Sequence, residues 1–178
     1  MSYRPISDIW WLARAKLKDG RKYYGAYPGG FPERARALLG ATIDEPVLHV
    51  CGGMARHYPY APGFGPNDKT LDLDPGTEPD YLQDATAGLP GGFKAMLADP
   101  PYSEADADCY VPGSAAYPKP RAIVGAMLRA LRPGQRCGIL HYMPPRPPPG
   151  TRFVACIGVC VGYDNRLRCF SVYERGCP

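Results

Sequence analysis

Lys94-Ala-Met-Leu-Ala-Asp-Pro-Pro-Tyr-Ser103 is the stretch that decides the fold of this chain. An apolar run, Ala95 to Ala98, stops abruptly at a carboxylate and two prolines. Such a run is typical of a strand buried in a parallel sheet, and the prolines put its carboxyl end at Asp99. Open α/β sheets bind their ligands at this edge. We therefore predict an α/β fold with a functional site around Asp99.

The four residues Asp99-Pro100-Pro101-Tyr102 suggest a particular chemistry. Two consecutive prolines remove two N–H donors and fix two φ angles, so the carbonyl groups of Asp99 and Pro100 are held rigidly. The carboxylate and a fixed carbonyl can accept both hydrogens of one NH2 group, while the tyrosine ring stacks on the flat base that carries it. This would orient a nucleobase amine, which is a poor nucleophile, without a general base of unusual pKa. The plainer alternative is a Pro-Pro turn with an incidental aspartate.

Three earlier strands are predicted to end in residues of similar interest. An apolar strand within residues 45–53 ends in Gly52-Gly53, which would let a ligand approach the backbone. A second strand, in residues 69–75, carries Asp72 at the distance from the glycines at which dinucleotide-binding folds place a ribose-binding acid. A third short strand ends in Asp84. The same sheet edge would therefore collect a glycine pair and three carboxylates.

The amino-terminal part is predicted to be helical. Ser7-Asp8 can cap a helix through Leu17, within residues 1–22, with apolar residues at helical spacing. Its basic residues form either a solvated face or a surface that contacts DNA. The loop at residues 23–32 then leads into a short helix at 33–40, whose amino terminus would attract a carboxylate.

The carboxyl-terminal part is predicted to complete the sheet. A loop at 103–118, a helix at 119–131 and a strand at 136–142 are followed by a polyproline segment. Two long strands at 151–162 and 167–173 should form an antiparallel hairpin. We find no internal repeat, so residues 1–178 are predicted to form a single domain.

Composition narrows the class of protein. The chain has 178 residues with 22 prolines, 21 glycines and a net charge of +4, which is compatible with a nucleic-acid partner. It has no 18-residue apolar run and no signal-like start, so we expect no membrane span and a cytoplasmic location. The seven cysteines include no CxxC pair, so we expect reduced thiols and no metal site.

Residues 23–142 resemble the class I S-adenosylmethionine-dependent methyltransferases, and among them the enzymes that methylate nucleobase amines. Asp99-Pro100-Pro101-Tyr102 matches their catalytic motif, and Val47-Leu-His-Val-Cys-Gly-Gly53 is similar to their glycine-rich cofactor motif. The resemblance implies a Rossmann-like sheet, mostly parallel with a carboxyl-terminal antiparallel hairpin, and S-adenosyl-L-methionine as cofactor. The cofactor contacts that it implies are those of Tyr27, Pro28, Cys51, Gly52, Gly53, Asp72, Asp84 and Ala85.

The sequence departs from this family at three positions of the cofactor motif. Cys51 and Ala55 stand where the first and third glycines are usual, and His49 stands where an acidic residue is common. Residues 54–68 are too rich in proline and glycine for the helix expected there. The sheet should therefore have few helices and some uncovered surface, which suggests a possible homodimer.

The family motif bears on the substrate. Asp-Pro-Pro-Tyr points to adenine N6 more than to cytosine N4, and it also occurs in guanine-N2 RNA methyltransferases. The expected protein is a DNA adenine-N6 methyltransferase, with Tyr102→Phe tolerated because the ring does the stacking. The alternatives are an RNA base amino-methyltransferase and a catalytically weak binding subunit. No target-recognition domain is evident, so the 103–118 loop and the amino-terminal segment are the candidates for reading a target sequence.

Overall fold

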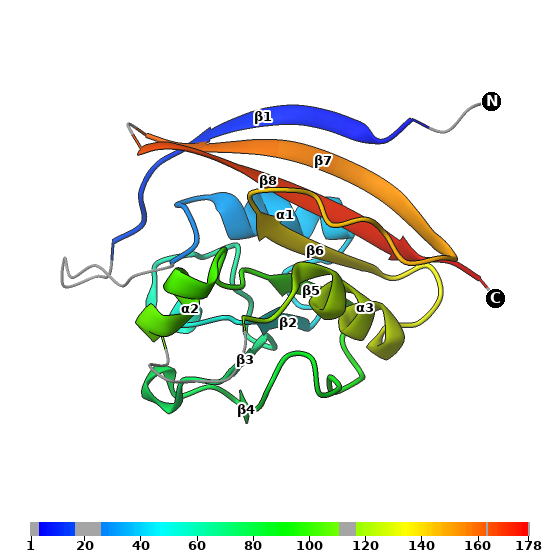
Figure 1. The fold of residues 1–178 in the computed structure, drawn as a ribbon, viewed down its shortest axis with the longest axis horizontal. Helices are drawn as coiled ribbons and strands as arrows, with labels where there is room; N and C mark the ends of the chain where they lie inside the picture. Colours follow the sequence, from blue (N-terminus) through cyan, green and yellow to red (C-terminus); the bar gives the residue numbers. More distant parts are fainter. Residues whose placement is uncertain (1–3, 17–25, 111–116, 163, 178) are drawn as a thin grey trace.

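The computed structural model describes residues 4–16, 26–110, 117–162 and 164–177. These residues form one eight-stranded sheet in the order β1-β7-β8-β6-β5-β2-β3-β4 (Figure 1). The strands are β1 (Ile6–Leu12), β2 (Val47–Val50), β3 (Lys69–Asp72), β4 (Tyr81–Leu82), β5 (Ala95–Ala98), β6 (Arg136–His141), β7 (Thr151–Val161) and β8 (Asp164–Arg175). The helices are α1 (Phe31–Leu39), α2 (Glu104–Tyr110) and α3 (Pro120–Ala130), with short 3-10 turns at Ala55–His57 and Pro75–Thr77.

The sheet is mostly parallel, which confirms the predicted fold class. Strands β4, β3, β2, β5 and β6 run parallel to one another, and β8 then runs antiparallel to both β6 and β7. Strands β2 and β5 are buried at every residue, as expected for central strands that are covered on both faces. The run Ala95 to Ala98 is therefore the middle of the sheet, as the sequence predicts.

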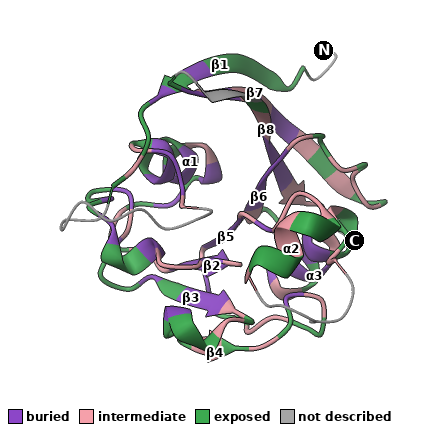
Figure 2. Ribbon diagram, turned by 60° about the vertical axis from the view of Figure 1, so that its left-hand side comes forward, coloured by how far each residue is buried: buried purple, intermediate pink, exposed green. Residues whose placement is uncertain are grey.

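One helix covers each face of the sheet (Figure 2). Helix α1 lies between two left-handed glycines, Gly30 and Gly40, and buries Phe31, Ala35 and Leu39 at four-residue spacing. Helix α3 buries its own apolar stripe in a second core cluster on the opposite face. As predicted, residues 54–68 contain only a single 3-10 turn among their elements.

The predicted amino-terminal helix is wrong over Ile6–Leu12, which form strand β1 parallel to β7. Trp10 and Leu12 point into the core, whereas Ile9 and Trp11 are 60% and 73% exposed. This alternation is the period of a strand, and the partner that selects it lies almost at the other end of the chain. The prediction is also wrong for residues 13–16, which are not helical, Ala13 forming a bridge with Gly29, whereas residues 17–22 lie outside the described part of the chain.

The predicted 103–118 loop is partly helical. Ser103 begins α2 as a capping residue: its Oγ accepts from the N–H of Asp106 at 3.1 Å and donates to that carboxylate at 2.8 Å. The reciprocal bonds explain why Glu104–Tyr110 form a helix where composition suggested none. Residues 111–116 are outside the described part.

One face of the β1-β7-β8 flank carries exposed apolar side chains. Ile9, Trp11 and Leu167 are each more than half exposed. Such a surface is what the homodimer prediction requires, and the homodimer stays a prediction. In the described residues, no helix has the length and apolarity needed to cross a membrane.

Candidate functional site

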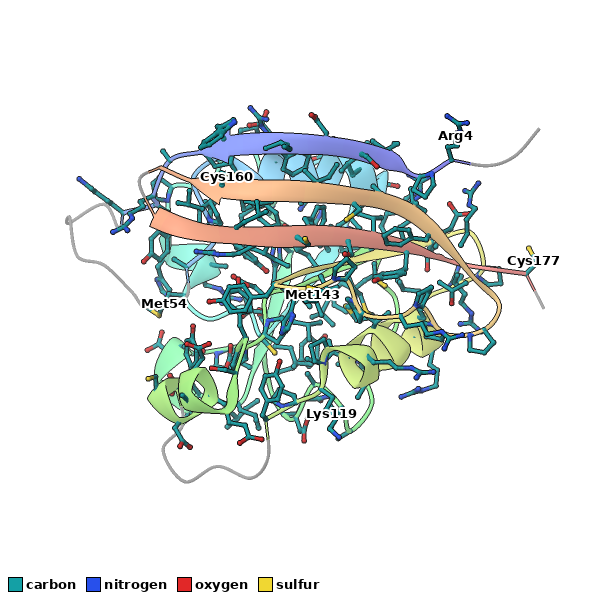
Figure 3. The ribbon with its side chains drawn as sticks, turned by 45° about the horizontal axis from the view of Figure 1, so that its top comes forward. Arg4, Met54, Lys119, Met143, Cys160 and Cys177 are labelled. Atoms are coloured by element: carbon teal, nitrogen blue, oxygen red, sulfur yellow. The ribbon has the colours of Figure 1, made fainter. Side chains whose placement is uncertain are left out.

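The carboxyl ends of β2 and β5 meet at one point of the sheet edge. Val50 pairs with Ala98, the last residue of β5, and the N–H of Asp99 donates to the carbonyl of Val50 at 3.2 Å. The turn after β2 therefore lies directly beside Asp99. In Figure 3 the labelled Met54, which follows this turn, lies on the same side of the molecule as α2, which follows Tyr102.

Asp99 is held by the tyrosine of its own motif. The hydroxyl of Tyr102 donates to Asp99 Oδ1 at 2.6 Å. Burial raises the pKa of Asp99 to about 6, although the charge of Arg168 and the bond from Tyr102 both lower it. Asp99 is therefore a half-buried carboxylate that is ionised at neutral pH and protonated in mild acid. The hydroxyl of Tyr102 has a role that the sequence analysis did not foresee.

Aromatic side chains from two other segments surround Tyr102. The ring of His141 meets it edge-on at 5.4 Å, and the ring of Tyr142 lies 4.8 Å away. The hydroxyl of Tyr117 lies 2.8 Å from His141 Nε2 and donates to the carbonyl of Tyr102 at 3.2 Å. Burial lowers the pKa of His141, so this histidine is neutral at pH 7. Neutral side chains thus fix the motif on this side.

The His141 tautomer follows from its two neighbours. Its Nδ1 accepts from the N–H of Met143 at 3.4 Å, which leaves the proton on Nε2. Nε2–H then donates to the hydroxyl of Tyr117, and that hydroxyl donates to the carbonyl of Tyr102. The strand β6 and the segment before α3 are thereby tied to the Asp-Pro-Pro-Tyr motif.

Asp72 clamps the turn that follows β2. Its two carboxylate oxygens accept from the N–H of Gly53 at 2.8 Å and from that of Asp74 at 3.1 Å. Burial raises its pKa above the ordinary value. The predicted spacing of Asp72 and the glycines thus corresponds to a direct contact.

The turn explains why Gly52 is retained and shows what the replacement of a glycine by Cys51 costs. A Cβ on Gly52 would lie 2.8 Å from the carbonyl oxygen of His49, so glycine is required there by the protein's own packing. Cys51 has φ 52°, a left-handed conformation that costs a non-glycine residue about 1–2 kcal/mol. Burial raises the pKa of its thiol well above the ordinary value, so Cys51 is a packed thiol. Among the described residues, no three His, Cys, Asp or Glu side chains are grouped as metal ligands.

Asp84 and Ala85 lie just beyond β4. Asp84 is exposed, and its Oδ1 accepts from the N–H and the hydroxyl of Thr86 at 2.7 and 2.8 Å. Ala85 is buried in the same core cluster as β2 and β5. Their contacts with a cofactor stay a prediction.

Tyr27 and Pro28 are buried in the described structure, so a cofactor contact by either side chain stays a prediction too. The Tyr27 ring stacks on Phe31 at 5.5 Å, and its carbonyl accepts from the hydroxyl of Tyr60 at 2.5 Å. Its own hydroxyl lies 3.4 Å from His49 Nδ1. Tyr27 therefore anchors the predicted loop to the core.

A buried ionic network lies beside β2 and was missed by sequence reasoning. Asp68 has a fully buried side chain that pairs with Arg36 and with His49 Nε2. The same carboxylate accepts from the N–H groups of Val47 at 2.9 Å and Gly65 at 2.8 Å. Burial alone would raise the pKa of Asp68, but the bonds from His49 and Arg36 outweigh it and the pKa is lowered. The Asp68 carboxylate thus supports β2, the strand in which His49 stands at the position where the resembling family commonly has an acidic residue.

Four residues at the site were not assigned to it by sequence reasoning, and for two of them the sequence pattern could have predicted the position. His141 and Tyr142 end a predicted parallel strand, which places them at the same edge as Asp99. No such pattern exists for Tyr117 and Arg168, because one lies in a predicted loop and the other near the start of an antiparallel strand.

Comparison with known proteins is informative about the fold. No family model matches the chain. A stretch of 61 residues, 34% of this chain, is 46% identical to mercuric reductase from Serratia marcescens, but it spans only 12% of that protein and establishes no shared family.

Solved structures of methyltransferases share the fold. TrmN from Thermus thermophilus superposes with a TM-score of 0.62 at 19% identity over 85% of this chain, which spans half the length of TrmN. A candidate methyltransferase from Streptococcus mutans in complex with SAH has a TM-score of 0.51 at 9% identity, over 80% of this chain and 96% of that one. An rRNA methylase from Streptococcus thermophilus has a TM-score of 0.50 at 10% identity, over 83% and 97% of the two chains. The likeness confirms a methyltransferase-type sheet.

Proposed function

We propose that this chain is an S-adenosylmethionine-dependent methyltransferase that methylates the exocyclic amine of a nucleobase, with adenine N6 in DNA as the first candidate. The observation that carries the proposal is the position of Asp99. Its carboxylate stands at the end of β5, bonded to Tyr102 and beside the turn after β2. An acceptor for an amine and a candidate cofactor turn are thereby neighbours at the ligand-binding edge of the sheet.

The residues at this edge fit an adenosine-containing cofactor. Asp72 offers a carboxylate whose oxygens accept backbone bonds and have further lone pairs for ribose hydroxyls. Asp84 offers an exposed carboxylate just beyond β4, which is three strands away from β5 in the sheet. The Streptococcus mutans structure supports the assignment, since SAH is what S-adenosylmethionine becomes after methyl transfer. When bound, S-adenosylmethionine supplies an electrophilic methyl group.

The chain's own residues orient the amine. Asp99 and the carbonyl of Pro100 accept its two hydrogens, and the negative charge of Asp99 stabilises the nitrogen as it becomes positive. The ring of Tyr102 stacks on the base, an interaction worth roughly 1–3 kcal/mol. With a pKa of about 6, Asp99 can also take the proton that the methylated amine releases, a role that revises the expectation that no base of unusual pKa is needed.

A structured or unpaired RNA is the second candidate substrate. The observation that favours it is the fold shared with an rRNA methylase. A duplex DNA substrate must first have its target base flipped out, at a cost of a few kcal/mol, whereas an unpaired base avoids this cost.

Labelled S-adenosylmethionine tests the proposal. The protein is incubated with duplex DNA, single-stranded DNA and structured RNA, and the labelled base is identified after hydrolysis. Label on adenine N6 of DNA supports the first candidate, and label on an RNA base amine supports the second. Cofactor binding without transfer to any of them would identify a binding subunit instead.

Asp72→Ala should weaken S-adenosylmethionine binding about tenfold or more, because it removes a charged hydrogen-bond acceptor worth roughly 1.5–3 kcal/mol and releases the amide of Gly53. Calorimetric titration measures the change. Asp74→Ala is the comparison, since Asp74 caps only the following turn through Gly76. Full affinity in Asp72→Ala with a loss in Asp74→Ala would move the ribose contact to Asp74.

The pH–rate profile of methyl transfer should have an acid limb: at pH values below about 6 the rate decreases, because Asp99 takes up a proton and stops accepting from the amine. In Tyr102→Phe this acid limb should move to higher pH, because the lost bond is one of the two influences that lower the pKa of Asp99. This revises the expectation that Tyr102→Phe is tolerated. Tyr142→Phe, which alters a neighbouring ring, should leave the limb in place. If the acid limb of Tyr102→Phe is identical to that of the parent protein, the hydrogen bond from Tyr102 to Asp99 does not affect methyl transfer.

A further inference from the structure

The terminal hairpin brings a cation to the motif that ends β5. Strand β8 is antiparallel to β6 and pairs Cys169 with His141, the last residue of β6. Arg168 is therefore the next residue outward, at the edge where the parallel strands end. Its guanidinium carbon lies 5.6 Å from the centre of the Tyr102 ring, a cation–π distance.

Arg168 is also the cation that acts on Asp99. Its positive charge lowers the pKa of Asp99 against the effect of burial. Burial also keeps four titratable side chains around the Asp99–Tyr102 pair neutral at pH 7, because it shifts each pKa away from ionisation. They come from the loop before α1, the turn after β2, the segment at 58–60 and β6: Tyr27, Cys51, Tyr60 and His141. Asp72 is a further carboxylate, bonded to the turn after β2, and its charge acts with that of Asp99 to raise the pKa of Tyr27 and Cys51.

We propose that Arg168 is a positioning residue of this site, which holds the ring of Tyr102 and balances the charge of Asp99 so that the pair keeps its hydrogen-bonded arrangement. The catalytic role of Asp99 rests on the proposed function, whereas the coupling of the three side chains does not. The hairpin is then part of the working site as well as the antiparallel end of the sheet.

The coupling predicts a measurable change in the titration of Asp99 when Arg168 is replaced. A nearby opposite charge typically shifts a carboxyl pKa by 1–3 units. Replacing Arg168 with methionine keeps the apolar stem and removes the charge. The titration midpoint of Asp99 should then rise by about one pH unit from its value near 6. Arg168→Lys keeps the charge and should restore most of the midpoint.

Carbon-13 NMR of aspartate carboxyl groups measures the midpoint directly. The Asp99 signal is assigned by its loss in Asp99→Asn. Arg152→Met is the matched control, because Arg152 lies on the same hairpin and pairs with Glu174 on the surface. It removes the same charge from the protein and should leave the Asp99 midpoint unchanged. The acid limb of methyl transfer is recorded in parallel for each variant.

The proposal is established if the Asp99 midpoint rises in Arg168→Met, recovers in Arg168→Lys and does not move in Arg152→Met. An Asp99 midpoint that stays at the parent value in Arg168→Met, or moves equally in Arg152→Met, would overturn it. If Arg168→Met does not fold, Arg168→Lys and Arg168→Gln supply the same comparison. Absence of methyl transfer in the parent protein would count against the proposed function only, since the titration needs no substrate.

Discussion

Methyl transfer by Asp99→Ala is expected to be about 100- to 1000-fold slower than in the parent protein, the loss typical of removing one preorganised group from a reacting centre. The substitution removes one acceptor for the amine, the negative charge beside the developing positive nitrogen, and the partner of Tyr102. Affinity for S-adenosylmethionine should survive, because Asp99 acts on the substrate side. Single-turnover rates with saturating cofactor, together with calorimetric binding, separate the two effects.

Two variants make this result specific. Asp44→Ala removes an exposed carboxylate that precedes β2, at the opposite end of the strands from Asp99, and should leave the rate unchanged. Asp99→Asn keeps the shape and should be as slow as Asp99→Ala. A parent-like rate in Asp99→Ala would mean that the strand merely happens to end in Asp-Pro-Pro-Tyr.

Asp99→Asn should also stabilise the fold at pH 7. Because the pKa of Asp99 rises from 3.8 to about 6 on folding, the folded state binds its proton more tightly, and stability is lost as pH rises from about 4 to about 6. A neutral side chain escapes this loss, so we expect a gain of about 1–3 kcal/mol, or several degrees in melting temperature.

Asp68→Ala should reduce the free energy of unfolding by about 3–5 kcal/mol, the range found when one member of a buried charge pair is removed. The substitution removes the buried carboxylate that pairs with the guanidinium of Arg36, which then keeps only its bonds to backbone carbonyls such as those of Thr42 and Glu45. It also removes the acceptor of the N–H groups of Val47 and Gly65. Urea unfolding followed by circular dichroism measures the loss. Since folding lowers the pKa of Asp68, its contribution is present above about pH 4 and fades below it.

The comparison variant is Asp80→Ala. Asp80 pairs with Arg56 and Lys69 near the surface, where such pairs contribute about 0–1 kcal/mol. A loss in Asp68→Ala no larger than that in Asp80→Ala would show that the buried network carries little stability.

Local patterns in the sequence predict the centre of this fold well. Every side chain of residues 95–98 is apolar, which indicates a covered strand, and three of the four residues of Val47–Val50 are apolar as well, with His49 as the exception. The sites at their ends follow from the rule that parallel strands finish at one edge. The contact between Asp72 and Gly53 is a consequence of that rule and of strand length.

The parts that could not be predicted depend on distant partners. Trp10 fits a helical stripe as well as an alternating strand, and pairing with β7 decides between the two. Arg36 and Asp68 look like surface charges until the fold buries them against His49. Arg168 reaches Tyr102 only because an antiparallel hairpin brings it to an edge otherwise made by parallel strands.

The position of β1 has a consequence for biosynthesis. Ile6 pairs with Ala155, so β1 leaves the ribosome well before its partner strand β7 is made. Until then the backbone groups of β1 lack their β7 partners. Pairing over so long a loop is slow compared with local contacts. Among the eight strands of this sheet, β1 is thus synthesised before the others but can pair only after β7 is made, and a nascent chain stalled before β7 would leave Trp10 without the β7 strand beside it.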